Sequence, residues 1–299
     1  MKLSIIIVSF NTRDVLKDCL TSLFTHHKTE IAKRLFEIIV VDNGSTDETQ
    51  AMIKKQFPRV KLIQNARNEG FGKANNVAAR KTISEYVLFL NPDTIVPVQT
   101  LDTLLSYLET HVDVGIVTCK VLLTHGKIDD ASHRGFPTPW RALTHFSGLS
   151  QLFPRSMFFN GYHLGYQRMD EPHEIDACAG AFLMMRRKVG ELVGWFDEDY
   201  FWYGEDLDLC FRVKQAGFKI MYVPEVSITH VKGAASGFKK HSKHLAKIDN
   251  ETRKKLVEAR FSVMRTFYKK HYQHKYSWIT MQLVLLGIWI KQKITEMTA

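Results

Sequence analysis

Three acidic side chains lie close together in the second half of the chain, directly after a run of large aromatic residues. Residues 201–203 read Phe-Trp-Tyr, and Glu205, Asp206 and Asp208 follow after one glycine. Aromatic neighbours lower the local dielectric and raise the basicity of a carboxylate, which suits a general base. The same acids would also stabilise the first turn of a helix through its dipole. On a helix Glu205 and Asp208 share a face while Asp206 points about 100° away, so the cluster offers two roles that residue types alone do not assign.

A polar loop at residues 42–47 carries side chains that suit a nucleotide. Asp42 offers a carboxylate that can accept from a ribose hydroxyl or a base N–H, and Gly44 and Ser45 precede a predicted helix whose free amides add donors. The same short polar residues would also suit a turn followed by a helix cap. The loop therefore has two open interpretations, a nucleotide contact or local hydrogen bonding.

A glycine-containing loop follows the next predicted strand and leads into a helix. Gly70 and Gly72 permit close backbone approach to a ligand, and Arg67 and Lys73 could face phosphate oxygens. The spacing is not G-x-G-x-x-G, because Asn75 stands at the third position, and it is not a P-loop. The loop therefore disfavours a dinucleotide redox cofactor.

Two further residues are candidate metal ligands. Asp93, in the tetrapeptide Asn-Pro-Asp-Thr, follows a predicted strand, and a divalent cation that bridges a diphosphate needs only one or two carboxylates. Asp93 could equally cap the helix predicted to begin near Pro97. His230 ends another predicted strand before a run of small residues, 232–237. It either completes a metal site or has a purely structural role.

Alternating strands and helices must position these loops. Apolar runs predict strands at residues 3–8, 36–41, 60–64, 86–90 and 114–118, with helical periodicity between them. Ser45 and Glu48 have the capping-box spacing for a helix that runs to about residue 57. The alternation predicts an α/β fold with a doubly wound sheet, whose ligands bind beyond the carboxyl ends of the strands.

The second half of the chain is less regular. Residues 124–173 combine four prolines with many aromatic side chains and no period, which suits either an irregular core or a mobile acceptor-binding or lid segment. Regularity returns with a strand at 182–185, a helix at 205–216 and a strand pair at 218–223 and 226–230.

The net charge of +10 is a property of the C-terminal part. Residues 231–299 hold 15 Lys and Arg against 4 Asp and Glu, so the rest of the chain is close to neutral. The apolar stretch 278–290 is too short to span a bilayer, which needs about 20 residues. It could lie on an anionic leaflet or pack against the domain or a partner subunit. Four widely separated cysteines predict neither disulfides nor a zinc site and fit a reducing cytosol.

Six segments, taken in order, carry a family resemblance. They are IIVSFN within residues 5–11, VDNGSTD at 41–47, NEGFGKANN at 68–76, FLNPDT at 89–94, DACAGAFLMMRR at 176–187 and GWFDEDYFWYGEDLDLCFRVKQAG at 194–217. The chain resembles the family 2 inverting glycosyltransferases of GT-A fold, particularly the bacterial rhamnosyltransferase-like branch. The resemblance covers residues 3 to about 237.

The resemblance implies a GT-A (Rossmann-like) doubly wound mixed sheet with a basic helical C-terminal extension. It also implies that Asp206 is the base, that Glu205 supports it, and that Asp93 binds Mn²⁺ or Mg²⁺, with His230 as a further candidate ligand. Asn91 replaces the first acid of a full D-x-D element. The expected nucleotide-sugar site comprises Ser9, Asn11, Asp42, Gly44, Ser45, Arg67, Asn68, Gly70, Phe71, Asn75, Asn91, Asp176 and Gly180.

These expectations combine into one predicted function. A sugar, with rhamnose suggested by the resemblance, moves with inversion from a nucleoside-diphosphate donor to a hydroxyl of a cell-surface glycan or lipid-linked acceptor. The catalytic domain is expected at residues 1–237 and the basic helical region at 238–299. We expect the protein in the cytoplasm at the inner face of the membrane, with a homodimer through the C-terminal region as an alternative use of that region.

Two other classes compete with this prediction. A sugar-nucleotide nucleotidyltransferase would show a glycine-rich triphosphate loop followed by lysine in the first turn, and residues 9–13 read Ser-Phe-Asn-Thr-Arg. A nucleic-acid-binding protein would use the basic tail but would leave the acidic loops unexplained, since they repel phosphate without a metal. We therefore expect no nucleic-acid partner.

Overall fold

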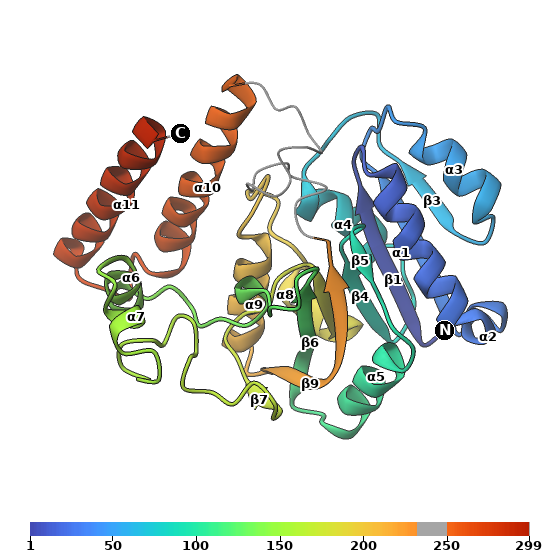
Figure 1. Cartoon of the computed structure of the whole chain (residues 1–299), viewed down its shortest axis with the longest axis horizontal. Coiled ribbons are helices and arrows are strands. Elements are labelled where there is room, and N and C mark those ends of the chain that lie inside the picture. Colours follow the sequence, from blue (N-terminus) through green and yellow to red (C-terminus); the bar gives the residue numbers. More distant parts are fainter. Residues whose placement is uncertain (232–249, 299) are drawn as a thin grey trace.

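A single mixed sheet forms the centre of the molecule in the computed structural model (Figure 1). Its strands run in the order β3 (Lys61–Gln64), β2 (Phe36–Asp42), β1 (Leu3–Ser9), β4 (Tyr86–Leu90), β8 (Phe182–Arg186), β6 (Val114–Leu123), β9 (Lys219–His230) and β5 (Thr94–Ile95), with β7 (His173–Glu174) paired to β9. Strands β1 to β4 are parallel, and β8 is antiparallel to both of its neighbours. The predicted α/β class and mixed sheet are confirmed.

The structure describes residues 1–231 and 250–298, apart from the side chains of 250–257 and 298. The run of small residues at 232–237 and the first part of the expected basic region, 238–249, lie outside the described residues. Within the described helices, none is both long enough and apolar enough to cross a bilayer.

Strand β1 shows why the sheet is covered on both faces. Ile5 and Ile7 point into one core layer, whereas Ile6 and Val8 point into the other, because successive side chains of a strand alternate between faces. The first layer is closed by α1 (Arg13–His26), α3 (Thr49–Gln56) and α5 (Thr100–Thr110); α2 (Lys28–Ala32) follows α1. The second is closed by α4 (Phe71–Ala79), α8 (Arg187–Val193) and α9 (Glu205–Gln215). The four cysteines are buried thiols, as expected.

Two local predictions are wrong. The helix predicted from the capping-box spacing begins only at Thr49, because Asp47 Oδ1 accepts the Thr49 amide (3.2 Å) while Ser45 Oγ accepts the Asn11 amide (2.9 Å). The predicted strand pair is one strand, β9, whose pairing with β6 shifts register between Cys119 and Lys120. A register shift lets a single strand pass a proline without ending.

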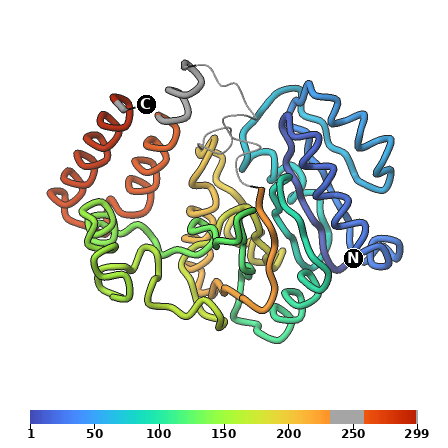
Figure 2. The backbone as a smooth tube through the Cα atoms, in the orientation of Figure 1, coloured from blue at the N-terminus to red at the C-terminus, as the bar shows by residue number. Residues whose placement is uncertain are grey.

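The C-terminal helices pack on the second core layer. Helix α10 (Asn250–His271) buries Phe267 and Tyr268 against it, and α11 (Trp278–Thr298) runs back beside α10. The irregular segment 124–173 contributes only short elements: η1 (Asp130–Ser132), α6 (Pro139–Phe146) and α7 (Leu149–Leu152). Figure 2 shows α6 and α7 at the same end of the molecule as α10 and α11, away from the N-terminal strands.

The order of the parallel strands defines where a ligand can bind. From β1 the chain moves outward to β2 and β3, then returns to place β4 on the other side of β1. In open α/β sheets the usual ligand position is at such a reversal, beyond the carboxyl ends of the two strands, here β1 and β4. Asn11, Asp42 and Asn91 all lie at this edge.

Candidate active site

The loops after β1 and β2 are joined by hydrogen bonds. Thr46 N donates to Asn11 Oδ1 (2.8 Å), and the Ser9 and Thr12 hydroxyls lie 2.8 Å apart. Asp42 is fully buried, and its Oδ2 accepts from Gln50 Nε2 at 2.7 Å. Its Oδ1 is buried without a hydrogen-bond partner among the described residues. A buried carboxylate oxygen left unpaired is costly, so Asp42 is prepared to accept a donor from a ligand.

The loop after β3 is organised by Asn43. Its Nδ2 donates to Asn68 Oδ1 (2.8 Å), and its Oδ1 accepts from Glu69 N (3.1 Å). Gly44 adopts φ +86°, and a Cβ there would lie 2.8 Å from Arg67 Cα. Only glycine permits this close passage of the two loops. Arg67 itself is exposed and paired with Glu69.

Three loops meet around Phe71. Its amide donates to Phe201 O at 3.3 Å, and Gly70, at φ +88°, passes so close that a Cβ would lie 2.6 Å from the same oxygen. The ring of Phe71 lies beside Gly180, where a Cβ would be 3.1 Å from its edge. The loops before α4, α9 and β8 are therefore brought together. Phe201 is 54% exposed, so the aromatic run does not shield the acids as expected.

Two predicted binding residues are engaged with the protein itself. Asn75 is buried and its Nδ2 donates to Phe71 O one helical turn earlier, at 3.0 Å. Asp176 receives Arg141 Nη1 at 2.6 Å and lies 3.2 Å from Lys214 Nζ. The contacts of Asn75 stabilise α4, and those of Asp176 attach α6 to α9. Their predicted contact with a nucleotide sugar remains a prediction.

The candidate metal ligands come together through a strand pair. Thr94 of β5 is opposite His230 of β9, and Val231 N donates to Asp93 O at 2.8 Å. As a result His230 Nε2 lies 3.2 Å from Asp93 Oδ1 and 3.5 Å from Asn91 Nδ2. On the other side of the ring, Nδ1 lies 3.4 Å from Asp129 Oδ2. Burial disfavours the charged ring, but the two carboxylates outweigh it and raise the pKa of His230 to about 9.

These residues fit a hard divalent cation. Asp93 Oδ1 is buried and, despite its closeness to His230, has no aligned hydrogen-bond partner among the described residues. Carboxylate, amide oxygen and imidazole nitrogen are donors that suit Mn²⁺ or Mg²⁺. Over residues 1–231 and 250–298, no three His, Cys, Asp or Glu side chains form a preformed metal cage. A cation here would therefore depend on further ligands from a bound diphosphate and water.

The two candidate acids at the start of α9 have different surroundings. Asp206 accepts from Gly180 N (3.2 Å) and Leu207 N (2.7 Å), and Arg134 Nη2 lies 3.1 Å from its Oδ1. Glu205 is buried and its Oε2 has no partner among the described residues. Burial, followed by the charge of Asp206, raises the pKa of Glu205 to about 8. Glu205 is thus held as a neutral acid beside an ion-paired Asp206.

The third acid of the cluster has a structural environment. Asp208 is fully buried and accepts from Arg212 Nε (2.7 Å) and His271 Nε2 (2.6 Å). Burial opposes its ionisation, but the His271 and Arg212 contacts prevail and lower the pKa of Asp208. Asp208 therefore ties α9 to α10 and leaves Glu205 and Asp206 as the candidates for chemistry.

Two hydrogen bonds through residues 180 and 181 connect Asp206, the candidate base, with the Asn91–Asp93 turn, which carries candidate metal ligands. Because β8 is antiparallel to β4, Phe182 is opposite Leu90, and the residues just before β8 lie at the carboxyl end of β4. Ala181 O accepts the Asn91 amide at 3.2 Å, and the preceding residue, Gly180, donates to Asp206. Asp206 and the Asn91–Asp93 turn are therefore neighbours at one edge of the sheet.

Comparison with known proteins decides the assignment. The family model described as Glycosyl transferase family 2 matches residues 4–193, well over half of the chain. The chain belongs to this family of glycosyltransferases. The glycosyltransferase is 30% identical over 240 residues to the rhamnosyltransferase WbbL of Escherichia coli (strain K12), covering 76% of this chain and 82% of WbbL. It is 29% identical over 227 residues to N-acetylglucosaminyl-diphospho-decaprenol L-rhamnosyltransferase of Mycobacterium tuberculosis, covering 72% of each chain.

Solved structures share the fold of the glycosyltransferase. Staphylococcus aureus TarS 1–349 superposes with a TM-score of 0.56 at 18% identity, over 98% of this chain and 81% of that one. The mannosyltransferase PcManGT from Pyrobaculum calidifontis, solved in complex with GDP-Man and Mn²⁺, gives a TM-score of 0.57 at 15% identity, over 97% and 69% of the chains. These similarities confirm the predicted GT-A fold.

Three residues of the candidate site are not singled out by the sequence. Asn43 lies in the polar loop 42–47, is 2% exposed and holds the neighbouring loop. Arg134 and Asp129 both come from the irregular segment 124–173, where no period predicts which side chains point inward. Burial disfavours the cation of Arg134, but the Asp206 carboxylate more than compensates and keeps its pKa raised.

Proposed function

We propose that the protein is an inverting glycosyltransferase in which Asp206 is the general base and the Asn91–Asp93 turn holds a divalent cation with His230. The two hydrogen bonds that lead from Asn91 through Ala181 and Gly180 to Asp206 support the proposal, since they bring the two groups to one edge of the sheet. The donor nucleoside would occupy the adjacent loops and donate to Asp42 Oδ1, which has no hydrogen-bond partner among the described residues.

The reaction is a single displacement at the anomeric carbon. Asp206 takes the proton of an acceptor hydroxyl as its oxygen bonds to that carbon, and the bond to the diphosphate oxygen breaks on the opposite face. A bound divalent cation supplies positive charge next to the departing diphosphate. Arg134 and the Gly180 amide fix the orientation of the Asp206 carboxylate, and such positioning keeps the base in line with the acceptor.

The relatives suggest the substrates. WbbL and the mycobacterial enzyme are both named rhamnosyltransferases, and the latter is named for an N-acetylglucosaminyl-diphospho-decaprenol acceptor. We infer a deoxythymidine-diphosphate rhamnose donor and a lipid-linked or cell-surface glycan acceptor for this chain. We also infer action at the cytoplasmic face of the membrane. We propose that the catalytic domain comprises residues 1–237 and the basic C-terminal region residues 238–299.

A two-stage assay tests the proposal. Thermal-shift measurements with a panel of nucleoside diphosphates, with and without Mn²⁺, should show one base that stabilises the protein and a larger shift with the cation. The matching nucleotide sugar and a polyprenyl-diphosphate N-acetylglucosamine acceptor should then give a glycosylated lipid of inverted anomeric configuration. A protein that binds none of the diphosphates, or a product with retained configuration, would contradict the proposed function.

A further inference from the structure

Helix α11 is apolar on two opposite faces, and the described chain covers only one of them. Met281, Val284 and Ile288 pack inward on the second core layer. On the outward face, six apolar side chains recur at spacings of three and four residues and are between 44% and 86% exposed: Ile279, Leu283, Leu286, Ile290, Ile294 and Met297. A surface helix normally presents polar side chains to water, so this stripe indicates a binding partner.

A second exposed apolar patch adjoins this stripe. It comes from α6, α7 and the turn after them, and its members are between 43% and 70% exposed: Leu143, Phe146, Leu152, Phe153, Met157 and Phe158. Lys291 of α11 lies over the ring of Phe146, 5.8 Å from its centre, so the two patches meet. We call these twelve residues the apolar end face. In Figure 1 α6, α7 and α11 together form one end of the molecule.

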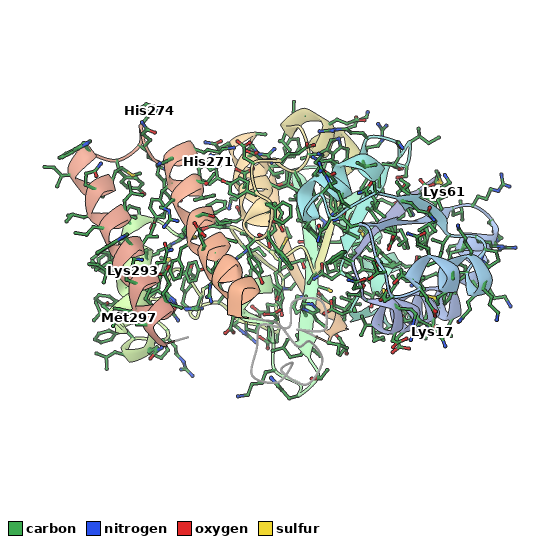
Figure 3. All side chains as sticks on the ribbon, turned by 90° about the horizontal axis from the view of Figure 1, so that it is seen from above. Lys17, Lys61, His271, His274, Lys293 and Met297 are labelled. Carbon is green, nitrogen blue, oxygen red and sulfur yellow. The ribbon has the colours of Figure 1, made fainter. Side chains whose placement is uncertain are left out.

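The charges around the apolar end face are mostly basic. Residues 139–160 and 271–297 contain five Lys and Arg and one acid, Glu296, which pairs with Lys293 at 2.8 Å. Arg141 turns inward to Asp176, which leaves Arg155, Lys275, Lys291 and Lys293 at the surface. Figure 3 shows Lys293 and Met297 along α11, at the opposite end of the molecule from Lys17 and Lys61. A second copy of this basic face would be repelled, whereas an anionic surface complements it.

Three tryptophans support a lipid partner. Trp140, Trp278 and Trp289 are 39%, 74% and 53% exposed on the same elements. Indole rings are enriched at the boundary between headgroups and acyl chains, because they combine a large apolar body with a polar N–H. A folded protein partner would instead require a polar rim of matching shape.

The apolar end face is also connected to the reaction site. The irregular segment that carries α6 and α7 also supplies Arg134, which lies 3.1 Å from Asp206. The Arg141–Asp176 ion pair then links α6 to the strand bridge between Arg134 and Ala177. A surface held by this face would therefore lie beside the segment that borders the base.

We propose that the apolar end face docks the glycosyltransferase onto an anionic lipid bilayer. The apolar and aromatic side chains enter the interface, and Arg155, Lys275, Lys291 and Lys293 contact the headgroups. The inference deepens the proposed function, since a lipid-linked acceptor would reach Asp206 from this side. It is testable without any acceptor, because docking is measured by vesicle binding alone.

Flotation with vesicles tests the docking face. The full chain should bind phosphatidylcholine vesicles that contain about 30% phosphatidylglycerol, bind pure phosphatidylcholine more weakly, and lose affinity as salt is raised. The double variant Leu286→Asp/Ile290→Asp should bind at least about tenfold more weakly, because two inserted side chains become charged. The matched control is Val112→Asp, which changes an apolar residue that is even more exposed, next to the end of α5, and should bind like the wild type.

Several outcomes separate docking from its competitors. Unchanged vesicle binding by the double variant overturns the proposal, and so does a wild-type dimer, seen by light scattering without vesicles, that the double variant dissociates. Nucleotide-induced thermal shifts on the same samples report on the fold and the donor site. A wild-type protein that binds vesicles but no nucleotide would contradict the proposed function and still support docking. Nucleotide binding by a double variant that no longer floats supports both.

Discussion

Arg134 Nη2 lies 3.1 Å from Asp206 Oδ1, and both side chains are largely buried. The arginine comes from the irregular segment and the aspartate from the first turn of α9, 72 positions apart in the sequence. A guanidinium forms strong charge-assisted hydrogen bonds with a carboxylate and fixes its orientation. The contact therefore joins the segment nearest the proposed membrane face to the proposed chemical step.

Replacement of Asp206 by asparagine should remove the base and little else. Asparagine keeps the shape of the side chain, and its single amide oxygen can still accept from Arg134 and Leu207, whereas the contact of the other carboxylate oxygen with Gly180 N is lost. We expect kcat to fall by about 10²- to 10⁴-fold, with nucleotide affinity unchanged. Steady-state rates and calorimetric titration with the nucleoside diphosphate measure the two quantities. Asp170→Asn, at an exposed acid, is the control, and a joint loss of rate and nucleotide affinity in Asp206→Asn would argue against a base.

The Asp93→Asn variant should uncouple nucleotide binding from the metal. Asp93 offers a buried carboxylate oxygen with no aligned partner among the described residues, and loss of its charge removes the anionic ligand at that turn. Wild-type affinity for the nucleoside diphosphate should fall when EDTA removes the cation and return with Mn²⁺, whereas the variant should respond weakly to both. Asp102→Asn on the exposed side of α5 should behave as wild type. An undiminished Mn²⁺ response in Asp93→Asn would exclude Asp93 as a ligand.

Asp129 should act on the metal through His230. Its Oδ2 lies 3.4 Å from His230 Nδ1, on the side of the ring that faces away from Asp93. A carboxylate in this position orients the imidazole and strengthens it as a ligand. Asp129→Asn should therefore weaken Mn²⁺ binding about 10- to 100-fold, measured by the electron paramagnetic resonance signal of free Mn²⁺. The control is Asp130→Asn, which changes the neighbouring exposed acid. Equal Mn²⁺ affinities in the two variants would show that Asp129 does not act on the metal through His230.

The raised pKa of Glu205 should appear in the pH dependence of stability. Its folded-state pKa of about 8 lies above its ordinary value of 4.5, so the folded protein binds this proton more tightly than the unfolded chain does. Stability from this group is complete below about pH 4.5 and is lost as the pH rises through about 8. Thermal melts should show the wild type losing stability relative to Glu205→Gln over that window. Glu85→Gln, at an exposed site, is the control, and its stability should follow that of the wild type at every pH. If the stability of Glu205→Gln also stays parallel to that of the wild type, the pKa of Glu205 is not raised.

The contact between α10 and α9 should contribute strongly to stability. His271 donates to the fully buried carboxylate of Asp208 at 2.6 Å, so truncation leaves one oxygen of a buried charge without its partner. His271→Ala should lower the free energy of unfolding by about 3 kcal/mol. Urea denaturation measures the change, and Lys269→Ala, two residues earlier on an exposed position, should alter it little. A similar effect of both substitutions would mean that the contact is not stabilising.

The sheet was predictable because its strands are apolar on both faces. The nearly continuous apolar run of β1 and the polar residues that follow β1, β2 and β4 define the ligand edge from sequence alone. The insertion of β8 between β4 and β6 was not predictable, since no local pattern encodes strand order. That insertion is what brings Gly180 to Asp206. The contacts of Arg134, Asp129 and His271 depend in the same way on long-range packing.

The attachment of α10 to α9 also sets an order of events during synthesis. Asp208 and His271 are separated by 63 positions, and the ring of Phe211 contacts Phe267, His271 and Tyr272. While a ribosome still holds these later residues, the helix that begins with Glu205 and Asp206 lacks one side of its surroundings. Helix α9 therefore reaches its final packing only after α10 has left the exit tunnel.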